Sequence, residues 1–168
     1  MKISVVKLRE LIREVMITNL GDGMKVIIEN EGRSITINLV EIGKPKAHAP
    51  GFITLQKKQV PNGTIWEVVN SGARSGYGPL LYDLAMEYVA GRLGDLGITP
   101  DTTTVSSEAQ GVWRFYLEKR SDVEHESLPP EIFIHAPARP EPLRYYYYKF
   151  ETPTLDDLET KSLVTYVV

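Results

Sequence analysis

The chain has 168 residues, a formal net charge of −3 and no cysteine. This length favours a single domain, and the slightly acidic charge argues against a nucleic-acid or anionic-membrane partner. The missing cysteines exclude disulfides, thiolate metal sites and cysteine nucleophiles. No apolar run reaches the roughly 18 residues of a membrane-spanning helix, and the N-terminus lacks the apolar core of a secretory signal. We therefore expect a cytoplasmic protein.

The first twenty residues predict an amphipathic helix. Ser4 would cap its start, Gly21 would end it, and charged side chains fill the polar face. The apolar residues at helical spacing are Val5, Leu8, Leu11, Ile12, Val15 and Met16. We interpret residues 1–20 as a leader helix packed on the body of the domain, in preference to a helix that binds a partner.

Four strand-like segments follow the leader. They are rich in Val, Ile and Thr and are separated by Gly, Pro and Asn, which is typical of antiparallel strands joined by turns. Residues 43–51, between the second and third segments, have the composition of a loop. The predicted strands are Met24–Glu29, Ile35–Ile42, Phe52–Gln59 and Thr64–Asn70. Their order predicts a meander.

A glycine-rich turn, Arg74–Leu81, connects this meander to a predicted helix over Leu80–Leu93. A strand that breaks into glycines and restarts as a helix leaves backbone N–H groups without intrahelical partners. These donors lie at the positive end of the helix dipole, and glycines let an anion come close. Such a turn is suited to a phosphate or a pyrophosphate.

Two interpretations of this turn stay open. In the first, the anion is bound by Arg74 and by the backbone amides of Tyr77, Gly78, Leu80 and Leu81. In the second, Gly76 and Gly78 only form a tight turn that needs positive φ. Pro79 has no N–H, so one donor is missing. We favour the anion-binding interpretation.

Shorter elements follow the helix. A short strand is predicted at Thr102–Val105, and a capping box at Ser107–Gln110 starts a helix that ends near Arg120. Repeated prolines exclude a long helix after residue 121. The remaining predicted elements are strands at Ile132–Ile134, Leu143–Phe150 and Leu163–Val168 and a short helix at Thr154–Leu158. Together the elements predict an α+β fold with a mixed, largely antiparallel sheet flanked by helices.

The order of meander, glycine turn, helix, short strand and helix resembles the Gcn5-related N-acetyltransferase fold. There the fourth strand splays from the fifth, acetyl-CoA lies in the cleft, and its pyrophosphate sits on a turn of pattern Gln/Arg-x-x-Gly-x-Gly/Ala. Gly76-Tyr77-Gly78 is similar to the Gly-x-Gly part, and Leu80-Leu81 to the leucines that follow, whereas Ala73 stands at the basic position. The resemblance implies acetyl-CoA as co-substrate, with further contacts from Val69, Asn70 and Ser71.

A narrower resemblance covers roughly residues 66–148. Gly76–Asp83, Val105-Ser106, Val112-Trp113 with Tyr116, Arg120–Val123 and Pro142–Tyr147 are similar to segments of acetyltransferase-like proteins encoded by bacteriophages, and the leader helix is frequent in phage proteins. This resemblance implies a location in the infected bacterial host or in the virion. We divide the chain into a leader at 1–20, an acetyltransferase-like core at 21–128 and an irregular β-rich extension at 129–168.

The family resemblance also implies two catalytic residues. Glu67 matches the strand carboxylate that often takes the proton of the attacking amine. The alternative, which we favour, is a solvent-facing glutamate on a half-buried strand, with Trp66 and Val68 pointing inward. Tyr116 is similar to the tyrosine that protonates the departing thiolate, and it suits a core tyrosine with its hydroxyl at the edge equally well.

The remaining polar and aromatic candidates favour structural roles. His48, His125 and His135 are isolated, so we predict no metal site, and His125 fits a solvated surface cluster. Tyr145–Tyr148 fits a strand that shows tyrosines to both faces better than a surface that stacks bases.

The residues and the resemblance together indicate an acyl-CoA-dependent N-acyltransferase, which transfers an acyl group to an amine by direct attack. The amine belongs to a small molecule or a protein, with no nucleic-acid or membrane partner. The alternative is a catalytically inactive module of the same fold, acting in interactions or in the virion. A homodimer or a virion partner stays open.

Overall fold

The computed structural model describes residues 23–133 and 139–168, together with positions 4, 7, 8, 11, 14, 15 and 20. Most of the predicted leader helix at residues 1–20 lies outside these described residues, as does Ile134 of one predicted strand. Within the described part, no helix is long and apolar enough to cross a membrane.

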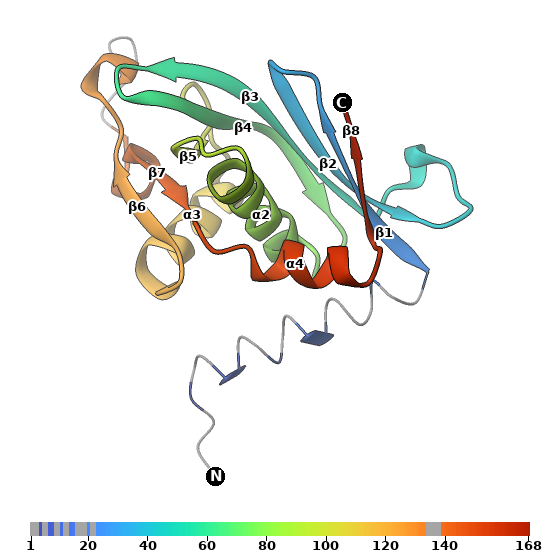
Figure 1. The fold of residues 1–168 in the computed structure, drawn as a ribbon. Coiled ribbons are helices and arrows are strands. Elements are labelled where there is room, and N and C mark those ends of the chain that lie inside the picture. The colour runs from blue at the N-terminus through green and yellow to red at the C-terminus, as the bar shows by residue number, and fades with distance from the viewer. Residues whose placement is uncertain are drawn as a thin grey trace.

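The described residues form one mixed sheet in the order β6-β7-β5-β4-β3-β2-β1-β8 (Figure 1). The pairs β4/β5 and β1/β8 are parallel, and the other neighbouring strands are antiparallel. The strands are β1 Met24–Asn30, β2 Ser34–Glu41, β3 Gly51–Val60, β4 Gly63–Ala73, β5 Gly97–Pro100, β6 Glu124–Ser127, β7 Tyr145–Tyr148 and β8 Val164–Val167. The chain beyond residue 128 therefore supplies both an inner strand, β7, and an edge strand, β8.

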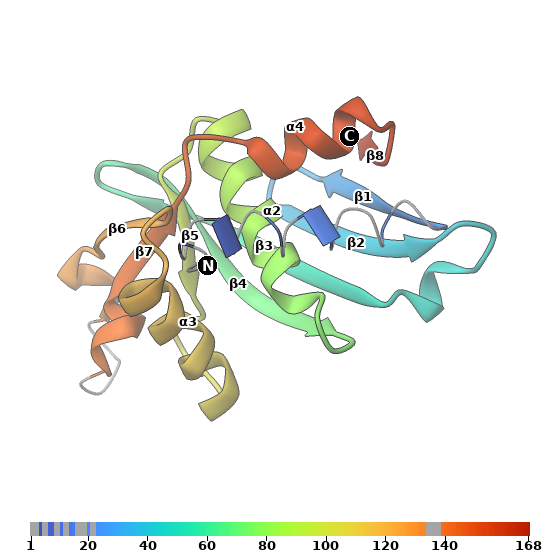
Figure 2. The ribbon, with the colours of Figure 1, turned by 90° about the horizontal axis from the view of Figure 1, so that it is seen from below.

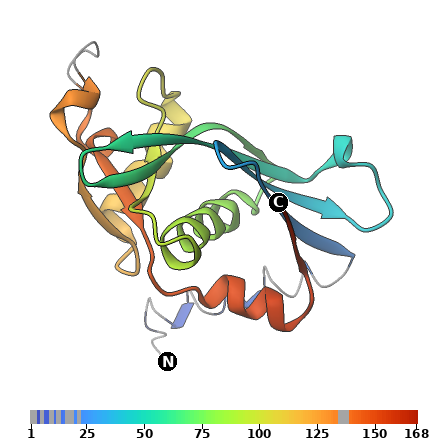
Figure 3. The same cartoon turned by 45° about the horizontal axis from the view of Figure 1, so that its top comes forward.

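The sheet is curved, and α2 (Gly78–Met86) lies against its concave face (Figures 1 and 3). A π-helical segment, η2 (Glu87–Arg92), extends α2. α4 (Pro153–Thr160) runs past α2 on the same side of the sheet and carries the chain from β7 to β8. α3 (Ser107–Lys119) lies toward the end of the sheet that holds β6 and β7 (Figure 2). Short 3-10 helices occur at Lys46–His48 (η1), Pro130–Phe133 (η3) and Glu141–Arg144 (η4).

Buried apolar residues alternate with more exposed ones along the strands, which explains why the helices cover one face of the sheet. Apolar residues at every second position of β2 and of the paired parts of β1 and β3 are fully buried, which is expected when one face of an antiparallel sheet packs on a core. These residues are Val26, Ile28, Ile35, Ile37, Leu39, Ile53 and Leu55, and they share a cluster with Leu80, Leu81, Leu84 and Ala85 of α2. The burial fixes the strand register, because a slip of one residue would turn this apolar set toward water.

The tyrosine strand β7 shows side chains to both faces, as predicted. Tyr147 is fully buried in the main core, whereas Tyr146 and Tyr148 pack with Ile65 and Leu128 in a second, smaller cluster. β7 therefore joins two apolar clusters.

The four predicted meander strands are confirmed as β1 to β4, with ends shifted by at most three residues. The strand predicted at Thr102–Val105 is wrong, because the strand in this region is β5 at Gly97–Pro100. Asp101 Oδ1 accepts hydrogen bonds from the N–H groups of Thr103 (2.7 Å) and Thr104 (3.1 Å), which commits these donors to a turn.

The predicted helices that fall within the described residues are also confirmed, with shifted ends. α3 is capped by Ser106 and not by Ser107, since the Ser106 hydroxyl accepts the N–H of Ala109 at 3.2 Å. The predicted helix over Leu80–Leu93 starts two residues earlier and becomes π-helical at Glu87. The strand predicted from Ile132 is wrong, because Ile132 belongs to η3.

Candidate functional site

A gap between β4 and β5 forms the centre of the candidate site. The two strands pair only through Ile65–Val68 and Gly97–Pro100, although β4 continues along β3 to Ala73. The pairing with β3 skips Val69, which marks a β-bulge. A bulge bends a strand and increases its twist, so β4 turns away from β5 at this residue. Within the described part of the chain, the edge of β4 beyond Val68 has no strand partner on the β5 side.

A hollow of about 200 Å³ occupies this gap. Its walls come from the free part of β4 (residues 68–71), from the loop after β5 (Asp101 and residues 104–106), and from the side chains of Tyr82 on α2 and Trp113 on α3. The two rings pack edge to face, with centroids 5.4 Å apart. The predicted contact residues Val69, Asn70 and Ser71 all line this hollow.

The glycine turn adjoins the gap and keeps some of the backbone N–H groups that were predicted to bind an anion. Gly76 has φ +93°, a conformation that favours glycine. Two of the predicted donors are engaged, since Tyr77 donates to the carbonyl of Arg74 and Leu81 to that of Tyr77, both at 3.2 Å. The N–H groups of Gly78 and Leu80 remain in the first turn of α2, where a helix offers no internal acceptor.

The charges around the turn are mixed. A second hollow, of about 420 Å³, lies between the turn and the start of α3 and is lined by Arg74 and Glu108. The Arg74 guanidinium is exposed and lies 3.2 Å from Glu41 of β2. A hydrogen bond from Lys44 is the main cause that lowers the pKa of Glu41, so this carboxylate keeps its charge. The Glu108 carboxylate lies on the other wall of this hollow and would repel an anion.

Tyr82 lines both hollows and was not predicted as a site residue. Its hydroxyl oxygen lies 3.3 Å from that of Ser71, where β4 runs free. Burial raises the pKa of Tyr82 above 10, so the phenol holds its proton at neutral pH. Sequence spacing contains a signal for it, because Tyr82 follows Gly78 by four residues and shares its helix face.

Tyr116 lies in a third hollow, of about 360 Å³, beyond the glycine turn. The residue is only 1% exposed, and burial raises the pKa of its hydroxyl well above 10. Tyr116 does not line the hollow at the strand gap, whereas Tyr82 does. The position fits the predicted core tyrosine whose hydroxyl reaches an edge.

Glu67 faces away from α2, and the prediction of a solvent-facing side chain is wrong. The residue is 9% exposed, and its Oε1 accepts the N–H of Thr102. Its Oε2 lies 3.6 Å from Nζ of Lys58. Glu67 is buried because the loop after β5 folds over it, which no local pattern in β4 indicates. The structure does not bring Glu67 together with Tyr116 or Tyr82, since its neighbours Trp66 and Val68 pack toward the helices.

Comparison with known proteins adds no assignment. No protein-family model matches the chain, and no curated protein matches its sequence.

The described residues also contain no group of three or more His, Cys, Asp and Glu residues that could hold a metal ion. His125 is exposed on β6, as predicted, and its ring packs edge to face on Tyr145 with centroids 5.0 Å apart.

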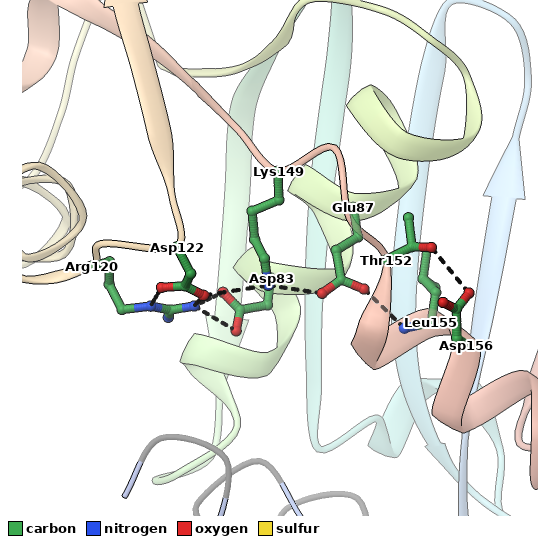
Figure 4. Close-up of polar contacts among 8 residues, drawn as sticks. All are labelled: Asp83, Glu87, Arg120, Asp122, Lys149, Thr152, Leu155 and Asp156. Atoms are coloured by element: carbon green, nitrogen blue, oxygen red, sulfur yellow. Dashed lines mark hydrogen bonds and ion pairs between the residues drawn. The ribbon is translucent and has the colours of Figure 1, made fainter. Parts of the chain in front are cut away.

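A network of charged side chains, most of them buried, ties α2 and its extension η2 to neighbouring segments (Figure 4). Arg120, which follows α3, donates to both carboxylate oxygens of Asp83 at 3.0 and 3.1 Å and to Asp122 at 2.7 Å. Burial works against ionisation of Asp122, but the hydrogen bonds from Arg120 outweigh it and lower the pKa of Asp122 far below its usual range. The end of α3 is thereby tied to α2.

A second part of this network ties α2 to the C-terminal segment. Nζ of Lys149 lies 2.8 Å from Oε1 of Glu87, and Oε2 of Glu87 accepts the N–H of Leu155 at 2.9 Å (Figure 4). Both side chains of the ion pair are almost fully buried. Burial raises the pKa of Glu87, and the contacts with Lys149 and Leu155 offset part of this rise. Glu87 thus pairs with a buried cation and caps the first turn of α4.

Proposed function

We propose that the protein is an acyl-CoA-dependent N-acyltransferase that uses acetyl-CoA as donor. The observation that carries the proposal is the separation of β4 from β5 around a hollow, with a glycine turn and a helix start beside it. An acyl-CoA is long and needs adjoining places for a thioester, for an amide-containing arm and for a pyrophosphate. The sequence resemblance to the Gcn5-related N-acetyltransferases leads to the same cleft.

In this proposal the free edge of β4 binds the arm of the coenzyme. Among the described strands, none pairs on the β5 side with the backbone N–H and C=O groups of residues 69–73. The amides of the pantetheine arm hydrogen-bond to them as an added strand would. The pyrophosphate lies at the N–H groups of Gly78 and Leu80, at the positive end of α2.

The transfer step follows from the groups that line the gap. The amine nitrogen attacks the thioester carbonyl carbon, and backbone N–H groups at residues 69–71 stabilise the oxyanion. The carbon–sulfur bond then breaks, and the Tyr82 hydroxyl donates its proton to the departing thiolate. The proton that the amine loses passes through water in the hollow and restores the tyrosine. The products are an amide and the free thiol of CoA.

Asp101 attracts the acceptor in this scheme. Burial works against its ionisation, but hydrogen bonds from Thr103 and Thr104 outweigh it and lower the pKa of Asp101. The carboxylate therefore stays charged at the wall of the gap and attracts an ammonium group. Asp101 is a weak base for the same reason, so the ammonium group gives its extra proton to solvent water and attacks as the neutral amine.

A second candidate function is a module of this fold that no longer catalyses and serves as an interaction or virion component. It is favoured by the mixed charges at the turn, where Arg74 pairs with Glu41 and Glu108 faces the anion seat. Mass spectrometry of purified phage particles tests it. Presence of the protein in particles supports this candidate, and its absence argues against it.

Calorimetric titration with acetyl-CoA tests the proposed function. Wild type should bind, and Gly78→Glu should not, because the new carboxylate enters the space that the pyrophosphate needs. Gln59→Glu is the matched control, since it adds the same charge at an exposed position near the other end of β4. If wild type does not bind acetyl-CoA, or if Gly78→Glu binds it equally well, the proposal fails.

A further inference from the structure

The loop after β5 is held by a carboxylate that does not line the gap. Glu67 is absent from the walls of the hollow, although the family resemblance implies a base at this position. Its Oε1 accepts the N–H of Thr102, and its Oε2 lies 3.6 Å from Nζ of Lys58 on β3. Nζ of Lys58 in turn donates to the Thr102 hydroxyl at 2.6 Å. Glu67 and Lys58 therefore hold Thr102 by its main chain and by its side chain.

A second charged side chain holds the other end of the same peptide group. The C=O of Asp101 and the N–H of Thr102 belong to one planar unit. The guanidinium of Arg139, which lies just before η4, donates to this C=O. The charge of Arg139 also attracts the carboxylates of Asp101 and Glu67. Because Glu67 holds the N–H and Arg139 holds the C=O, the orientation of the peptide plane is fixed.

The orientation of this plane determines where the Asp101 carboxylate lies. Oδ1 of Asp101 accepts the N–H groups of Thr103 and Thr104, the next donors along the chain. These hydrogen bonds form when the backbone turns back on the Asp101 side chain. They keep the carboxylate at the wall of the gap. A rotated peptide group would move both donors away and release the carboxylate from this wall.

We propose that Glu67 is a positioning residue, which holds the peptide group between Asp101 and Thr102 so that Asp101 faces the acceptor amine. The inference rests on the proposed function, in which Asp101 attracts the ammonium group. It gives Glu67 a role other than the base that the resemblance implies. A buried carboxylate needs partners, and the Thr102 N–H and Lys58 supply them. Both carboxylate oxygens are thereby committed to the loop.

NMR of the labelled protein at neutral pH tests this role, with butylammonium as the probe amine. Butylammonium should shift the carboxyl carbon of Asp101 in wild type. Glu67→Ala should shift the amides of Thr103 and Thr104 in the free protein and weaken butylammonium by about 2- to 5-fold, the range of an exposed ion pair. Glu67→Gln should match wild type in both respects, because its amide oxygen still accepts the Thr102 N–H. Both variants remove the same charge, so their difference isolates the hydrogen bond.

Glu29→Ala is the matched control. Glu29 on β1 also pairs with a lysine, Lys46, and lies toward the other end of the sheet from β5. This variant should leave the loop amides and butylammonium binding unchanged. The Lys58 side chain is 33% exposed, so water solvates its ammonium group when Glu67 is replaced.

The outcomes separate this inference from the proposed function. If Glu67→Ala keeps the wild-type loop amides and butylammonium affinity, or if Glu67→Gln weakens the probe as much as Glu67→Ala, the positioning role is wrong. If butylammonium does not shift Asp101 in wild type, the role is wrong as well. None of these results bears on acetyl-CoA binding. If the variants behave as expected but wild type binds no acetyl-CoA, the amine site held by Glu67 stands and the acyltransferase proposal fails.

Discussion

Replacing Lys149 by methionine probes the buried charges that hold the site helix. Lys149→Met keeps a long, flexible side chain and removes the cation 2.8 Å from Glu87. Glu87 is fully buried, so its carboxylate would lose its cationic partner and keep the N–H of Leu155. Removing one partner of a buried ion pair typically costs about 3–5 kcal/mol of the free energy of unfolding. This is a large part of the roughly 5–15 kcal/mol that stabilises a typical domain.

The stability that Lys149→Met loses should depend on pH, and the burial of Glu87 determines the direction of this dependence. Burial raises the folded pKa of Glu87 above the unfolded value of 4.5. The ionised carboxylate is therefore penalised at high pH, and the penalty falls as the pH drops through the folded pKa toward the unfolded one. Without Lys149 this pKa rises further, so the deficit of Lys149→Met should be smaller at about pH 5.5 than at about pH 8.

Urea unfolding followed by tryptophan fluorescence measures this effect, because Trp66 and Trp113 are both buried. The matched control is the double variant Lys149→Met with Glu87→Gln, which removes both charges and should recover much of the lost stability. A deficit of Lys149→Met below about 1 kcal/mol, the scale of an exposed pair, would refute the reasoning. An equal deficit at both pH values would refute it too.

Further substitutions test the proton donor and the strand packing. Tyr82→Phe should lower kcat by about 10²- to 10⁴-fold with little change in KM, and the defect should shrink with a thioester of a more acidic thiol. A wild-type kcat in this variant would exclude Tyr82 as the proton donor. Gly97→Ala should lose about 1–3 kcal/mol of stability, because its Cβ would lie 2.5 Å from the carbonyl oxygen of Tyr147. In the control Gly111→Ala the new Cβ enters open space, and this variant should gain about 0.5–1 kcal/mol of stability. Equal stability of the two variants would contradict the packing described for β5 and β7.

Local patterns predicted the parts of the fold that local interactions determine. The meander strands and the helices follow from alternation, turn residues and caps, so β1 to β4, α2 and α3 were found with small shifts. The cap of α3 was missed by one residue because Ser106 and Ser107 are both suitable N-caps.

Long-range pairing hid β5 and β6, whereas β7 and β8 lie within the strands predicted at Leu143–Phe150 and Leu163–Val168. β5 and β6 each have only four residues, and both pair with β7, which comes later in the chain. The pairing of β8 with β1, which lies more than a hundred residues earlier in the chain, was not predicted. Short segments of this kind carry little periodicity, and their pairing depends on tertiary contacts that sequence spacing does not contain.

The candidate site also has parts that local sequence determines and parts that depend on tertiary contacts. The turn at Gly76 was predictable because positive φ favours glycine, and the neighbouring residues 69–71 do line the gap. The burial of Glu67 was not predictable, since it depends on how the loop at Thr102 folds back. Tyr82 was not predicted as a site residue, although four-residue spacing places it on the face of Gly78.

The most direct test of the cleft is an amide chemical-shift map of the labelled protein titrated with acetyl-CoA. Binding across the gap should shift the amides of residues 69–71, along the free edge of β4, and those of Gly76, Gly78 and Leu80 at the turn. Amides on β1 and β2, away from the gap, should stay unchanged. No shifts at saturating acetyl-CoA, or shifts confined to β1 and β2, would contradict the proposed cleft.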